Sequence, residues 1–186
     1  MKHKFIFGLS ALLLMSCNLM GKKESETEKV TQETVEVEAL KFQLEAKSES
    51  GAEGTVSFTE ENGSVRLSAN LSNLSPGVHA IHLHEKADCS SEDGKSTGGH
   101  WNPTFEQHGS WGSDQGYHRG DIGNFSVDEN GNATVEFETD LWCLTCDDET
   151  KNIKGKAVIV HQGEDDLISQ PSGAAGSRII CGAIIE

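Results

Sequence analysis

Residues 56–71 read VSFTEENGSVRLSANL, and this stretch decides the fold class. Val56 and Phe58 alternate with polar residues, and Asn62-Gly63 follows them. After that pair the apolar residues again occupy every second position, at Val65, Leu67, Ala69 and Leu71. Such a period of two is typical of a half-buried β-strand, and Asn-Gly between two alternating runs favours a tight turn. The stretch therefore predicts an antiparallel β-hairpin.

The same period recurs along the chain, and no stretch has a convincing amphipathic helical period. Further strand-like runs occupy residues 40–46, 78–85, 125–127, 135–137, 157–161 and 179–185. Asn130-Gly131 lies between two of these runs and predicts a second hairpin. About eight short strands with two long connections, 87–120 and 162–177, predict an all-β fold, an eight-stranded Greek-key flattened barrel or immunoglobulin-like sandwich. Loops of that length are usually functional.

The N-terminal segment has the pattern of an export signal. Lys2 and Lys4 precede an apolar run over residues 5–15, which at about 11 residues is too short to span a membrane and suits a signal-peptide core. Residues 14–17, Leu-Met-Ser-Cys, resemble the bacterial lipoprotein box, in which the cysteine, here Cys17, is acylated. The alternative is an ordinary signal peptide that contains this cysteine. Both interpretations predict export, and the first predicts attachment to a bacterial membrane through the lipid only, on its periplasmic or cell-surface side.

Composition divides the rest of the chain. Residues 17–39 are rich in Glu, Lys, Ser and Thr and predict a solvated tether after the signal peptide at 1–16. Residues 40–186 are long enough to bury a core and predict one folded domain. The chain carries 15 Lys and Arg against 30 Asp and Glu, a formal net charge of -15, which argues against a nucleic-acid partner. The pattern leaves monomer and homodimer open.

Histidines are concentrated in the middle of the chain, with seven of the eight between positions 79 and 161. His82 and His84 are two apart on a predicted strand and therefore share a face, while His161 ends another strand. Alone, such residues are often solvated or hydrogen-bonded rim histidines. The long glycine-rich loop and the residues just beyond it hold three imidazoles and a carboxylate, a sensible tetrahedral zinc set, unless the loop is merely a polar surface: His100, His108, His118 and Asp121.

Several blocks, taken together and in order, resemble the copper-zinc superoxide dismutase family over nearly all of residues 40–186. The blocks are 79–85 (HAIHLHE), 99–103 (GHWNP), 107–109 (QHG), 118–124 (HRGDIGN), 160–161 (VH) and 176–182 (GSRIICG). The resemblance implies dismutation of superoxide to oxygen and hydrogen peroxide by a redox-cycling copper ion beside a structural zinc ion. The alternative is a copper- and zinc-binding module that keeps the fold without catalysis.

The resemblance also implies a role for individual residues. Copper would be bound by His82, His84, His100 and His161, and zinc by His100, His108, His118 and Asp121. An imidazole that binds two ions has lost its remaining proton, so His100 would be an imidazolate and a catalytic proton carrier. Arg178 would hydrogen-bond the incoming anion. Asp165 would link His82 to His108, although residues 164–166 alone indicate a solvated acidic run.

The five cysteines leave some pairings open. The resemblance implies a disulfide between Cys89 and Cys181, with free buried thiols as the alternative in a reducing compartment. Cys143 and Cys146 have no counterpart in the family pattern, and a local disulfide, a redox couple or half of a zinc site all fit their spacing. The export signal favours a structural disulfide.

Overall fold

The computed structural model describes residues 38–185. The predicted signal peptide, Cys17 and nearly all of the predicted tether lie outside this range, so the division of the chain at residues 17 and 40 stays a prediction. Within residues 38–185 no helix has the length and apolar character needed to cross a membrane.

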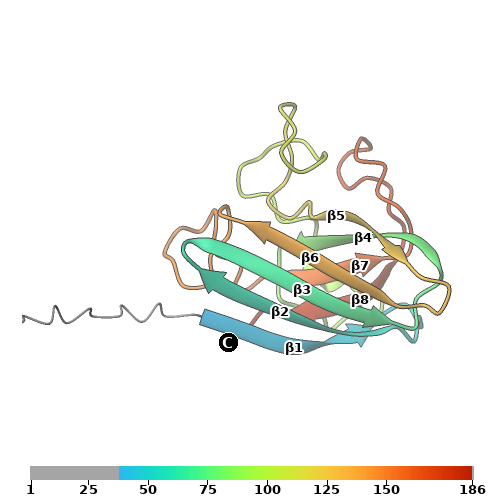
Figure 1. Ribbon diagram of the computed structural model, residues 1–186. Coiled ribbons are helices and arrows are strands. Elements are labelled where there is room, and N and C mark those ends of the chain that lie inside the picture. The colour runs from blue at the N-terminus through green and yellow to red at the C-terminus, as the bar shows by residue number, and fades with distance from the viewer. Residues whose placement is uncertain (1–37, 186) are drawn as a thin grey trace, which may run out of the picture. The chain divides into compact units, whose positions relative to one another are not determined.

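Eight antiparallel strands make up the fold, which confirms the predicted all-β class (Figure 1). The helical structure of the described residues is a single 3₁₀ turn, η1 (Lys95–Thr97), in the first long loop. The strands are β1 (Glu38–Ala46), β2 (Glu53–Glu61), β3 (Ser64–Ser72), β4 (Gly77–His84), β5 (Gly123–Val127), β6 (Ala133–Thr139), β7 (Ala157–His161) and β8 (Arg178–Ala183).

The strands form a nearly closed, flattened barrel with the order β5-β4-β7-β8-β1-β2-β3-β6. In Figure 1, β1, β2, β3 and β6 form the near layer, and β4, β5, β7 and β8 lie behind it. Only two residue pairs, Glu45 with Cys181 and Ala46 with Ile180, join β1 to β8. The non-consecutive pairings of β3 with β6 and of β4 with β7 each lie within one layer, so the connections β3–β4, β5–β6 and β6–β7 cross between the layers, as in a Greek key.

The first predicted hairpin is confirmed. Strands β2 and β3 pair from Glu61 with Ser64 to Glu53 with Ser72. Asn62 and Gly63 both have positive φ, 53° and 79°, as the tight turn between twisted strands requires.

The second predicted hairpin is wrong. The turn at Gly131 exists, but β5 pairs with β4 and β6 pairs with β3, so the two strands are the ends of the sheet order. The Asp128 carboxylate accepts hydrogen bonds from the backbone N–H groups of Asn130 and Asn132, and Leu74 N–H donates to the Gly131 carbonyl at 3.1 Å. These contacts fix the segment as a corner between the two layers rather than as a hairpin.

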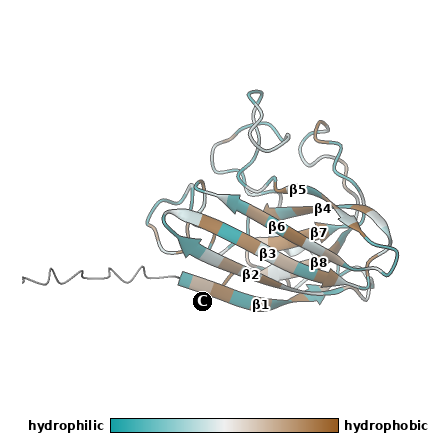
Figure 2. Ribbon diagram, in the orientation of Figure 1, coloured by the Kyte–Doolittle hydropathy of each residue, from teal (hydrophilic) through white to brown (hydrophobic). Residues whose placement is uncertain are grey.

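The core lies between the two layers, and apolar residues run along the strands that enclose it (Figure 2). Phe58 and Leu67 of the near layer are fully buried, as are Leu83 and Val160 of the other. Each such side chain contributes about 1.5–3 kcal/mol by leaving water. Strand β7 is buried along its whole length and β4 along its last six residues. These two strands are therefore a rigid platform for the histidines they carry.

Candidate metal centre

Two adjacent strands present three of the histidines. His82 and His84 project from one face at the end of β4, and β7 pairs with β4 alongside them. A break in the regular register between Val160 and His161 turns the last residue of β7 toward the same region, where it lies opposite Arg178 of β8.

The first long loop brings His100 to these strands because its backbone adds to the end of β4. His100 forms an isolated β-bridge with His84. The Leu83 N–H donates to the Gly120 carbonyl at 2.9 Å, and the Leu83 carbonyl accepts from the Trp101 N–H at 2.8 Å. The Gly120 N–H in turn donates to the Trp101 carbonyl. A Cβ atom at position 120 would collide with the Leu83 carbonyl, so this approach requires glycine. The three-way contact holds His100, His118 and Asp121 beside the barrel.

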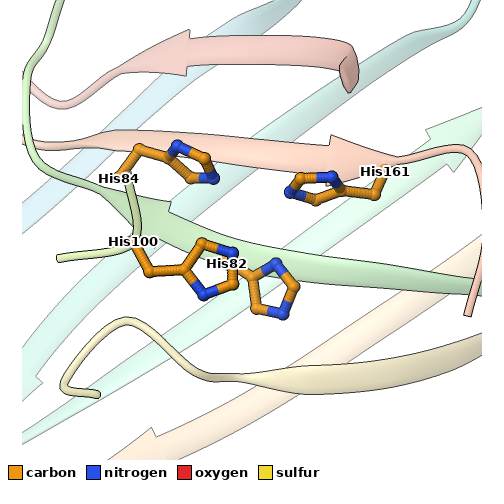
Figure 3. Close-up of side chains that lie close together, drawn as sticks. All are labelled: His82, His84, His100 and His161. Carbon is orange, nitrogen blue, oxygen red and sulfur yellow. The ribbon is translucent and has the colours of Figure 1, made fainter. Parts of the chain in front are cut away.

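The resulting histidines form two adjoining sets, each with candidate ligand atoms within 4.8 Å of one another. The first set is His82, His84, His100 and His161, whose rings converge in Figure 3. The second set is His100, His108, His118 and Asp121. Every member is at most 5% exposed, so these are not solvated surface histidines.

Hydrogen bonds at the outer ring nitrogens set the tautomers of the first set. His84 Nδ1–H donates to the Gly98 carbonyl at 3.0 Å, and His161 Nδ1–H donates to the Gly176 carbonyl at 3.3 Å. His82 Nε2–H donates to Asp165 Oδ2 at 2.8 Å. In a neutral imidazole the second nitrogen then carries a lone pair. Each of these three rings therefore directs a lone pair toward the others.

The inner nitrogens provide a test of whether a metal fits. His82 Nδ1, His84 Nε2, His100 Nε2 and His161 Nε2 are buried and have no hydrogen-bond partner, and the same holds for Nδ1 of His108 and His118. Buried polar atoms without partners are costly and rare. Four imidazole nitrogens suit copper, and three imidazoles with a carboxylate suit zinc. The residues present fit both metals.

Asp121 is the centre of the second set. Its carboxylate oxygens lie 2.8 Å from His100 Nδ1, 3.0 Å from His108 Nδ1 and 3.3 Å from His118 Nδ1. Backbone N–H groups of His118 and Gly109 also donate to it. His100 directs Nδ1 into this set and its unpartnered Nε2 into the other, so one ring belongs to both.

Asp165 connects the two sets from behind. It is 1% exposed and accepts from His82 Nε2 at 2.8 Å and from His108 Nε2 at 2.9 Å. Reciprocal hydrogen bonds with Asn124 and one from Leu167 N–H hold it in place. The interpretation of Asp165 as part of a solvated acidic run is therefore excluded, although Glu164 and Asp166 on either side are exposed.

Burial and charge shift the titration of the site. Burial lowers the pKa of His100 to about 4 and that of His161 to about 3. Burial also disfavours the charged form of His108, but Asp121 and Asp165 outweigh this effect and raise its pKa to about 9. The hydrogen bond from His100 to Asp121, and those from His108 and His82 to Asp165, hold the pKa of both carboxyl groups below the usual range despite burial.

These shifts predict that acid destabilises the metal-free protein. The ordinary pKa of histidine is about 6.5, so stability from neutral His100 and His161 is complete above about pH 6.5 and is lost as pH falls toward 3 to 4. The contribution of His108 has the opposite sign, because it is complete below about pH 6.5 and is lost as pH rises toward about 9. We expect urea unfolding of the metal-free protein to show a loss of a few kcal/mol between about pH 7.5 and 4.5. An unchanged free energy of unfolding over that interval would contradict the assignment.

Arg178 lies in one surface cleft with three members of the first set, His84, His100 and His161. Its Nη1 donates to the Gly94 carbonyl at 2.9 Å and to Thr97 Oγ1 at 3.1 Å. At the rim, Lys95 pairs with Asp93 at 2.8 Å. Asp93 therefore compensates the charge of Lys95. No Lys or Arg occurs between His161 and Arg178 in the sequence.

The structure contains two disulfides, Cys89–Cys181 and Cys143–Cys146. The first joins the long loop to β8 over a sequence separation of 92 residues, and the second closes a separation of 3. Disulfides are typical of exported proteins.

Two contributors to the site were not identified from the sequence. The Thr97 hydroxyl contacts both His84 Nδ1 and Arg178, and the Trp142 indole N–H donates to the Arg119 carbonyl beside His118 at 2.8 Å. No local pattern signals Thr97, because its partners are distant in sequence. The contact of Trp142 also joins residues that are remote in sequence, so no local pattern signals it.

The family model for copper/zinc superoxide dismutase (SODC) matches residues 52–184. The chain belongs to the copper/zinc superoxide dismutase family. The resemblance seen in the sequence is thereby confirmed. Members of the family normally bind copper and zinc, which agrees with the two sets of ligand atoms.

Solved structures agree with this membership. A double mutant of a SOD-like protein from Bacillus subtilis is 32% identical, with a TM-score of 0.70, over 78% of this chain and 97% of that one. The clock protein EA4 is also 32% identical, with a TM-score of 0.67, over 81% of this chain and 94% of that one. The SOD-like protein itself is 29% identical with a TM-score of 0.69, over 78% and 97% of the two chains.

Proposed function

We propose that this member of the family dismutates superoxide to oxygen and hydrogen peroxide. The single observation that carries the proposal is the set of buried imidazole nitrogens without partners, which converge from His82, His84, His100 and His161 beside Arg178. A zinc ion held by His100, His108, His118 and Asp121 would be structural, because protein ligands fill all four positions.

When bound, copper would supply the one-electron redox chemistry that dismutation requires, whereas zinc has no redox chemistry. His100 Nε2, which has no partner within the protein, would take up a proton and later donate it to the reduced product. His82, His84 and His161 keep their geometry throughout because their outer nitrogens are hydrogen-bonded. Arg178 attracts and orients the anion at the cleft.

A copper- and zinc-binding module without catalysis is the second candidate. The printed descriptions of the relatives, "SOD-like protein" and "clock protein", favour it because neither calls its protein a dismutase. The residues distinguish the two candidates. A storage module requires neither an arginine in the cleft nor one histidine shared between both sets, and this chain has both.

The deciding experiment measures superoxide consumption by stopped flow with the full chain loaded with copper and zinc. We expect Arg178→Ala to lower the rate about 10- to 100-fold at unchanged metal content, because a hydrogen bond to a charged group is lost. Arg66→Ala is the matched control, since Arg66 is exposed, pairs with Glu138 and does not line the cleft. Fully loaded protein that does not consume superoxide would establish the binding module instead.

We expect the rate to depend weakly on salt. Superoxide is an anion, and the loop between His161 and Arg178 lacks the free cations that would attract it over long distances. Raising the ionic strength from about 0.01 to 0.15 M shortens the Debye length from about 30 to 8 Å, yet we expect a change of less than about threefold. Stopped-flow rates across this range of ionic strength test the expectation. An uncharged osmolyte at equal viscosity is the control for effects of the salt other than screening. A steep fall in the rate with added salt would contradict this expectation, because it would show that cations attract superoxide over long distances.

The proposed setting is outside the cytoplasm. The two disulfides and the family agree with export. We propose further that Cys17 carries a lipid and that residues 17–39 tether the domain at 40–186 to a bacterial membrane, on its periplasmic or cell-surface side. Mass spectrometry of native protein tests this, since an unmodified N-terminus would exclude the anchor.

A further inference from the structure

Thr97 lies between the copper-side histidines and the cleft arginine. It is the last residue of η1, and its side chain is fully buried. Its Oγ1 lies 2.8 Å from the Gly94 carbonyl oxygen, 3.1 Å from Arg178 Nη1 and 3.3 Å from His84 Nδ1. The hydroxyl therefore touches both a proposed copper ligand and the proposed anion-binding group.

Chemistry fixes the direction of these three hydrogen bonds. A hydroxyl has one proton and two lone pairs. The Gly94 carbonyl can only accept, so the Thr97 hydroxyl donates to it and its oxygen accepts from Arg178 Nη1–H and His84 Nδ1–H. The His84 hydrogen is shared, since it also points to the Gly98 carbonyl at 3.0 Å. All hydrogen-bonding capacity of the hydroxyl is used.

The same contacts divide the donors of Arg178. Nη1 carries two hydrogens, and Gly94 O and Thr97 Oγ1 accept one each. Among the described residues no protein group is found to accept from Nη2 or Nε, which remain for a ligand in the cleft. Without the Thr97 hydroxyl, the guanidinium would be held by one hydrogen bond instead of two. The guanidinium could then rotate about the remaining bond to the Gly94 carbonyl.

We propose that Thr97 is a positioning residue that fixes the orientation of Arg178 relative to His84. The inference rests on the proposed function, because it concerns the anion site of that centre. Its hydroxyl joins the two groups into one unit with the Gly94 carbonyl. An anion on Arg178 is thereby held at a constant position relative to the copper-side set.

The test uses azide, a small anion that ligates copper(II), titrated into the copper- and zinc-loaded full chain and followed by its visible absorption. We expect Thr97→Val to weaken azide binding about three- to tenfold, as loss of one hydrogen bond implies, and Thr97→Ser to bind like the wild type. Ser96→Ala is the matched control, because the neighbouring Ser96 hydroxyl contacts only its own loop. In an Arg178→Ala background Thr97→Val should add no further loss.

Several results would overturn the inference. These are wild-type azide affinity in Thr97→Val, equal weakening in Thr97→Ser and Thr97→Val, or an additive double mutant. If Thr97→Val does not fold, Thr97→Ala carries the same expectation. Azide affinity is independent of turnover, so copper-loaded protein that binds azide without consuming superoxide would defeat the proposed function alone. Crystal structures of the metal-free wild type and the metal-free Thr97→Val variant give a readout without copper. An unchanged orientation of the Arg178 guanidinium in the variant would overturn the positioning role.

Discussion

The His161→Ala variant is expected to lose nearly all superoxide consumption together with its copper, while it keeps its zinc. His161 belongs to the first set of ligand atoms only, and its Nε2 is one of the buried nitrogens without a partner. Loss of a hydrogen bond behind a metal ligand already costs about 10- to 100-fold in affinity, so loss of the ligand itself is expected to cost more than about 100-fold in copper affinity. The activity should fall at least as far, because zinc cannot replace copper in electron transfer.

The reciprocal variant is His118→Ala, which removes a member of the second set and leaves the four imidazoles of the first set intact. It should lose zinc and keep copper. Both variants are to be dialysed against a weak chelator and then measured for metal content by elemental analysis and for rate by stopped flow. Copper retained at full occupancy in His161→Ala, with the wild-type rate, would remove the basis of the proposed function.

The fold was largely predictable because alternation is a local property. The runs at 56–58 and 65–71 specify a hairpin through their period and the intervening Asn62-Gly63, and the structure has it. The corner at Asn130-Gly131 was not predictable, since the same dipeptide fits either a hairpin or a passage between layers. The contact of Leu74 with Gly131, which is remote in sequence, decides between the two.

The candidate site divides in a similar way. Residue type and spacing give the ligands, because imidazoles two apart on a strand share a face and blocks such as 118–124 resemble the family. The burial of Asp165 does not follow from its sequence neighbours, which are exposed acidic residues. It results from Asn124 and two histidines that the folded loops bring to it. Contacts of that kind, including those of Thr97, depend on tertiary structure that no local pattern encodes.

Removal of the Cys89–Cys181 disulfide, as Cys89→Ser with Cys181→Ala, is expected to be the largest single loss of stability. The bond closes a separation of 92 residues, and the chain-entropy account gives about 4 to 5 kcal/mol for such a loop. Alanine is chosen at position 181 because that side chain is fully buried on β8, where a hydroxyl would lack a partner. Urea unfolding of the metal-free protein measures the difference.

The short disulfide is the matched control for this loss. Cys143→Ala with Cys146→Ser opens a separation of only 3 residues, for which the same account gives about 2 kcal/mol. Equal losses in the two variants would contradict loop entropy as the main source of stability. The activities should differ as well, because residues 89–97 carry the Gly94 carbonyl and Thr97 hydroxyl that hold Arg178, whereas the loop at 143–146 holds neither. We therefore expect the loaded long-disulfide variant to bind azide more weakly than wild type, and the short-disulfide variant to bind it equally well.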